Sequence, residues 1–92
     1  MSVEILENDQ SGEYDCHGRN ARVMGNDNNV SFRNCGIVSV PANQNTVHVY
    51  NARSIKVYGS SNIIYWAGDK KPETTIFGSH NQLSPITERR QP

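Results

Sequence analysis

The sequence predicts an all-β fold: a short β-solenoid of about four coils with 17-residue repeats, terminal caps and one disulfide. Three observations lead to this prediction. A pattern first seen in residues 21–32 returns three times, apolar and polar residues alternate on both sides of each turn, and eight valines and seven isoleucines stand against two leucines. Alternation is typical of strands with one buried face. β-Branched side chains also suit a pleated sheet better than a helix.

The repeats align residue by residue. They occupy residues 21–32, 38–49, 55–66 and 74–85, at spacings of 17, 17 and 19. The two longest inward columns are Val23, Val40, Val57, Ile76 and Val30, Val47, Ile64, Leu83. An antiparallel sandwich is the alternative fold. Only parallel stacking at about 4.8 Å would bring identical residues together, which favours the solenoid.

Each repeat also has a polar turn. Gly25, Gly59 and Gly78 share one slot, where the missing Cβ would permit a positive φ, and Ala42 fills that slot in the second repeat. Three residues later every repeat has an asparagine: Asn28, Asn45, Asn62 and Asn81. We interpret this column as a structural ladder of stacked amides rather than a ligand site.

The 92 residues make at most one domain. We expect residues 1–20 to form an N-terminal cap, 21–85 four repeats and 86–92 a polar tail. Cys16 and Cys35 are the two cysteines. A bridge between them would suit a small domain in an oxidising compartment, and two free thiols in a cytosolic protein are the alternative.

Composition and motifs argue against several functions. Nine basic and nine acidic side chains give zero formal charge, unlike a nucleic-acid binder. No apolar run is long enough to span a membrane, and residues 1–10 lack the features of a signal peptide, so an exported protein would have lost its signal. The histidines lie in different columns and the carboxylates are scattered. We expect no metal, no cofactor and no catalytic site.

Two outward-facing sets of residues suggest contact surfaces. An apolar column would run down one side of the stack: Met24, Pro41, Tyr58 and Phe77. Shielding of this column by the N-terminal segment or the C-terminal tail is the alternative. A second and weaker patch would contain His48, Tyr50, Tyr65 and Arg53, with the aromatic and arginine character of interface hot spots.

Several motifs also match a known family. They are Asp15-Cys16, Gly18-Arg19-Asn20, Gly25 to Val30, Asn34-Cys35-Gly36, Gly59 to Ile64, Trp66 with Gly68-Asp69, and Gly78 to Asn81. The chain resembles the bacterial family catalogued as domain of unknown function three thousand and sixty, small exported or lipid-anchored proteins with an iterated G-S-x-N-x-V motif. This resemblance implies export and a repeat fold but no activity. Ala42 departs from the pattern.

We therefore expect a non-enzymatic, exported protein-binding module of the periplasm or cell envelope, for instance an inhibitor or immunity protein for a toxin or hydrolase. The alternative is a structural component of a fibre, spike or phage that self-associates through the apolar column. Partners would be another protein or a second copy, with no nucleic acid and no membrane-spanning segment.

Overall fold

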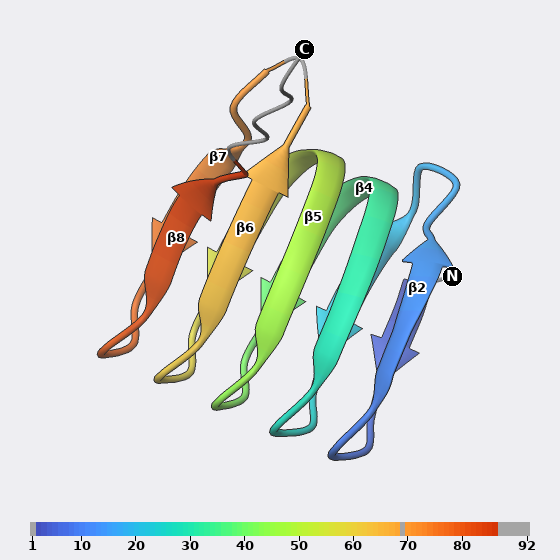
Figure 1. The fold of residues 1–92 in the computed structure, drawn as a ribbon. Coiled ribbons are helices and arrows are strands. Elements are labelled where there is room, and N and C mark those ends of the chain that lie inside the picture. The colour runs from blue at the N-terminus through green and yellow to red at the C-terminus, as the bar shows by residue number, and fades with distance from the viewer. Residues whose placement is uncertain (1, 69, 87–92) are drawn as a thin grey trace, which may run out of the picture.

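The chain winds into a flattened β-solenoid of five coils, which confirms the predicted fold class (Figure 1). The computed structural model describes residues 2–68 and 70–86. These residues contain no helix, and their strands are β1 (Ser2–Ile5), β2 (Ser11–Asp15), β3 (Asn20–Val23), β4 (Asn29–Val40), β5 (Thr46–Val57), β6 (Ile63–Ala67), β7 (Glu73–Ile76) and β8 (Gln82–Pro85). The strand pairs between successive coils are parallel.

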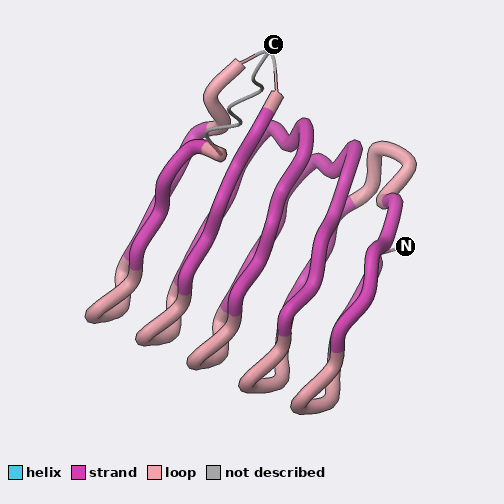
Figure 2. Tube along the Cα trace, viewed as in Figure 1, coloured by secondary structure: helices cyan, strands magenta, loops and turns pink. Residues whose placement is uncertain are grey.

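Two walls of strands enclose the core. The first wall stacks β1, β3, the second parts of β4 and β5, and β7; the second wall stacks β2, the first parts of β4 and β5, β6 and β8. Strands β4 and β5 bend from the second wall to the first without a loop (Figure 2). The bends fall at Asn34 and Asn51, whose φ angles are 58° and 66°. Asparagine tolerates this left-handed conformation better than most residues.

The N-terminal segment forms a coil of the solenoid. Val3 lies opposite Ala21 in the pairing of β1 with β3, and Gly12 lies opposite Val30 in the pairing of β2 with β4. The residues predicted to form a cap therefore supply an additional coil, which is the first of the five. The repeat pattern did not reveal this coil. Gln10 stands where later coils have asparagine, and Gly12 stands where they have valine, isoleucine or leucine.

The inward columns form the core that the repeats predict. Nine of its valine, isoleucine and phenylalanine side chains have no exposed surface: Val23, Val30, Phe32, Val38, Val40, Val47, Ile55, Val57 and Ile64. Ile76 occupies an inward column but is 42% exposed, because β7 belongs to the last described coil. Burial of apolar surface against both neighbouring coils stabilises the middle of the stack most.

The glycines of the turns do not have the positive φ that the sequence analysis predicts. Positive φ occurs two residues later in the turn, at Asp27 (59°), Ser61 (57°) and His80 (59°). Glycine is required instead because the coils approach closely: a Cβ on Gly59 would lie 1.7 Å from the Ala42 carbonyl oxygen. The expectation of positive φ at the glycines is therefore wrong, since the constraint comes from the neighbouring coil.

Asparagine side chains connect the turns of successive coils. The backbone N–H groups of Asn28, Asn45 and Asn62 each donate to the side-chain oxygen of the asparagine in the next coil, at 2.9 Å. In the opposite direction, the side-chain amides of Asn45, Asn62 and Asn81 donate to the carbonyls of Gly25, Ala42 and Gly59. A second ladder, which the sequence analysis missed, joins the N–H groups of Asn26, Asn43 and Ser60 to the side chains of Asn8, Asn26 and Asn43.

Cys16 and Cys35 form the predicted disulfide, which links the first coil to the second. Replacing both cysteines by alanine should reduce the free energy of unfolding by about 3 kcal/mol, because the unfolded chain gains the entropy of an open loop. Urea unfolding would measure this loss. We expect amide hydrogen exchange to rise most in residues 2–20, which the bridge ties to the stack. Equal protection in both proteins would contradict this role.

Candidate interaction surfaces

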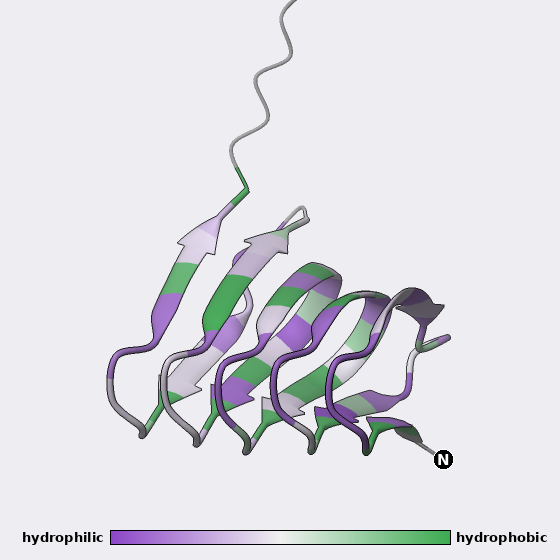
Figure 3. Ribbon diagram, turned by 60° about the horizontal axis from the view of Figure 1, so that its bottom comes forward, coloured by the Kyte–Doolittle hydropathy of each residue, from purple (hydrophilic) through white to green (hydrophobic). Residues whose placement is uncertain are grey.

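An apolar row lies on the outside of the solenoid where the first wall ends. The predicted members Met24, Pro41, Tyr58 and Phe77 are all exposed, and the N-terminal coil adds Leu6 at the same position. We call these five residues the apolar stripe. Figure 3 shows hydrophobic colouring at the ends of the strands beside this corner in successive coils. At about 4.8 Å per coil the stripe is about 19 Å long.

The two aromatic residues of the stripe stack on each other. The ring centroids of Tyr58 and Phe77 lie 5.3 Å apart and the ring planes differ by 9°. Each ring therefore covers one face of the other. Their exposed fractions are 45% and 70%, which leaves ample apolar surface for a partner.

The N-terminal segment does not cover the stripe. Its strand β1 pairs with β3 and carries Leu6, 63% exposed, into line with Met24. The other sequence-based alternative was shielding by the C-terminal tail, of which residues 87–92 lie outside the described part of the chain. Within the described part, the stripe is longer than predicted.

The second predicted patch is partly assembled. His48 and Tyr65 lie side by side on the second wall with ring centroids 5.0 Å apart. Together with Tyr50, Pro85 and Ile86 they line an open hollow of about 500 Å³. The hollow combines apolar ring surface with hydroxyl and imidazole groups, as ligand and peptide sites commonly do.

Arg53 is separated from these aromatic residues. It follows the bend at Asn51 and lines a different hollow with Ser54, Lys71 and Glu73. The sequence analysis grouped Arg53 with Tyr50 for the aromatic and arginine character of interface hot spots. The bend directs the chain onto the other wall between them.

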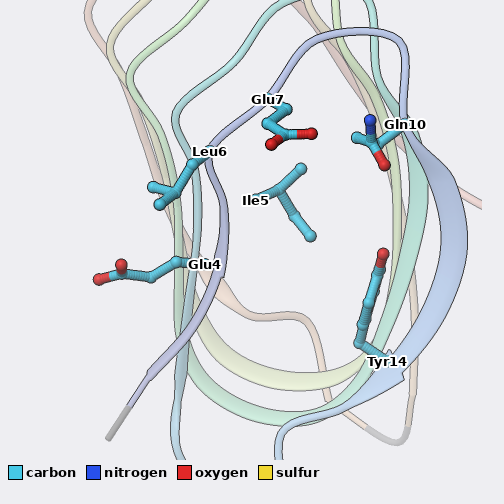
Figure 4. A pocket seen from close by; sticks show the side chains of 6 residues that line it. All are labelled: Glu4, Ile5, Leu6, Glu7, Gln10 and Tyr14. Carbon is cyan, nitrogen blue, oxygen red and sulfur yellow. The ribbon is translucent and has the colours of Figure 1, made fainter.

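A further hollow lies at the N-terminal end of the stack, and the sequence analysis did not anticipate it. Its volume is about 300 Å³, and it is lined by Glu4, Ile5, Leu6, Glu7, Gln10 and Tyr14 (Figure 4). The Tyr14 side chain runs along its own strand towards Gln10, and its ring centroid is 5.7 Å from that of Phe32. A Cβ on Gly12 would lie 3.1 Å from the Tyr14 hydroxyl, so glycine leaves room for this ring. The hollow is thus the uncovered end of the core.

Among residues 2–68 and 70–86, no three metal-binding side chains lie close enough together to hold an ion. The Cys16 sulfur is bonded to Cys35, so it is no free nucleophile next to Asp15 and His17. None of the described segments is a helix that could cross a membrane.

A comparison with models of protein families gives a match to this chain. The model of a family described as protein of unknown function (DUF3060) matches residues 23–80. The chain belongs to this family. The DUF3060 match extends from Val23 in the inward column to His80 in the last turn, so it contains the first three predicted turns and the fourth up to the residue before Asn81. Comparisons with curated proteins and with solved structures give no significant match.

The environment of Asp15 in this DUF3060 protein lowers the pKa of its carboxyl group. The His17 backbone N–H donates to its carboxylate at 2.9 Å and, with the Asn34 side chain and the charges of His17 and Arg33, lowers the pKa of Asp15 below the usual aspartate value. Asp15 therefore binds its proton less tightly in the folded than in the unfolded protein. Its stabilising effect is present above the unfolded pKa and is lost as pH falls through the folded pKa.

The variant Asp15→Asn should lack this pH dependence. We expect the difference in free energy of unfolding between wild type and variant to be constant near neutral pH and to shrink in acid as the pH falls through the lowered pKa of Asp15. Urea titrations at several pH values would measure it. Asp15 lies at the surface, where solvent screens its interactions, so the effect should be small. A difference that grows in acid would contradict a lowered pKa for Asp15 in the folded protein.

Proposed function

We propose that this protein is a non-enzymatic protein-binding module of the bacterial cell envelope, acting after export as an inhibitor or immunity protein for a toxin or hydrolase. The apolar stripe carries this proposal. A rigid row of five apolar side chains with two stacked aromatic rings has the character of a protein contact surface. The disulfide supports an oxidising compartment.

The form of the solenoid also supports binding rather than catalysis. Its core is filled by inward side chains of successive coils, and the hollows at its N-terminal end and beside Tyr65 are open depressions on its surface. Parallel hydrogen bonds between coils hold the outward residues at fixed spacing. A partner can therefore bind without first ordering the surface, which lowers the entropic cost of association.

A structural role is the second candidate. In that case the stripe would join copies of the chain into a fibre or spike. Its composition favours such self-contact, since aliphatic residues occupy one end and aromatic residues the other.

The double variant Tyr58→Glu/Phe77→Glu tests the proposed function. We expect it to lose binding to a partner that wild type retains after purification from the periplasm of the source bacterium, because both charges would be placed within the apolar contact. Asn29→Glu/Gln82→Glu is a matched control, because it adds the same charge at exposed positions of the second wall. Equal binding by all three proteins would exclude the stripe as the contact surface.

A further inference from the structure

The apolar stripe is self-complementary along its length. Leu6 and Met24 make its N-terminal half aliphatic, Pro41 lies at its centre, and Tyr58 and Phe77 make its C-terminal half aromatic. The residues occupy equivalent positions in five evenly stacked coils. If a second copy were turned by a twofold axis perpendicular to the stripe at Pro41, aliphatic side chains would meet aromatic ones in every pair outside the centre.

The charges beside the stripe distinguish the two possible orientations. On the same outer face of the first wall, two residues before each stripe residue, are Glu4, Arg22, Ser39, Lys56 and Thr75. The tips of the turns that follow the stripe are Asp9, Asp27, Gln44, Ser61 and His80, all exposed. The N-terminal half is thus acidic, since Arg22 is paired with Glu4 at 3.8 Å, whereas the C-terminal half carries Lys56 and His80.

We propose that the stripe joins two copies of this chain in an antiparallel pair. Leu6 of one copy contacts Phe77 of the other, Met24 contacts Tyr58, and the two Pro41 residues meet at the twofold axis. Methionine sulfur against an aromatic ring is a favourable contact. The antiparallel orientation also places the turn with Asp9 opposite the turn with His80 and sets Arg22, which is already paired with Glu4, opposite Lys56. A parallel pair would place the acidic halves against each other.

The antiparallel pair supplies a partner for the stripe and rests on the proposed function of the stripe as a protein contact. The pair would leave the hollow of His48, Tyr50 and Tyr65 on the second wall free for a different protein. A contact along one narrow row buries less than the roughly 1,200 Å² of a standard interface, so we expect weak association.

Sedimentation equilibrium would measure the association up to protein concentrations of about 1 mM, the range in which weak pairs form. Wild type should approach the mass of a dimer, and Tyr58→Glu should weaken association at least about tenfold. Asn29→Glu, which adds the same charge to an exposed site on the second wall, should associate as wild type does. A wild-type protein that remains a monomer would overturn the inference, and so would equal weakening by both variants.

Site-directed cross-linking tests the orientation. The two native cysteines are bonded to each other, so an introduced cysteine supplies a unique thiol. A short bismaleimide should link Leu6→Cys to Phe77→Cys in a mixture and should link Pro41→Cys to itself. Efficient linking of Leu6→Cys to itself would instead indicate the parallel orientation and overturn the inference. A monomeric wild type whose partner binding still depends on Tyr58 would overturn the pair but leave the proposed function standing.

Discussion

Gly59→Ala is expected to lower the free energy of unfolding by at least about 3 kcal/mol, at or above the upper end of the usual cost of overpacking. The added methyl group would lie 1.7 Å from the carbonyl oxygen of Ala42. That oxygen belongs to the backbone of the preceding coil, so the two coils must separate to admit the methyl group. The separation also weakens the hydrogen bond that the Asn62 amide donates to the same carbonyl at 2.8 Å. Urea unfolding would measure the loss.

Two substitutions serve as controls for Gly59→Ala. Ala42→Gly removes a methyl group from a turn that already accepts it, and its cost should stay near the conformational entropy of a glycine, about 1 kcal/mol or less. Gly18→Ala meets no atom within 4 Å but keeps a φ of 85°, so only the strain of that conformation is added. A loss from either control as large as that from Gly59→Ala would contradict the close approach of the coils as the cause.

Asn45→Leu is expected to cost about 2 to 6 kcal/mol, because two buried backbone groups would each lose a partner. The side-chain oxygen of Asn45 accepts from the Asn28 N–H at 2.9 Å, and its amide nitrogen donates to the Gly25 carbonyl at 3.0 Å. Leucine has a similar volume, so the substitution removes hydrogen bonds without opening a cavity. Chemical denaturation and amide exchange at Asn28 would measure the two consequences.

The same substitution at Asn28 should cost clearly less. Its side-chain oxygen accepts from the Gln10 N–H at 2.7 Å, but its amide nitrogen is buried without a hydrogen-bond partner in the described structure. Asn28→Leu thus removes one hydrogen bond and also a buried unsatisfied group. If Asn28→Leu destabilised the protein more than Asn45→Leu, the hydrogen-bond ladder would not be the main role of the column.

Much of the candidate surface could be predicted from the repeat alone. Met24, Pro41, Tyr58 and Phe77 share one column, and alternation along a strand places such a column outside once the inward columns are known. Leu6 was missed because its coil lacks the glycine and asparagine that mark the later turns. Whether Arg53 joins the aromatic patch depends on a bend within β5, which alternation does not reveal.

The sequence by itself determined the parallel stacking, the register and the identity of the core columns, because a fixed period of apolar and asparagine residues is satisfied only when equivalent residues lie over one another. The tertiary structure alone decided the contacts that each residue makes with the neighbouring coil. The approach of Ala42 to Gly59, the bond from Asn28 to Asn45 and the stacking of Tyr58 on Phe77 each join residues that are 17 or more positions apart. Their geometry depends on how closely two coils approach, a distance that neither repeat sets alone.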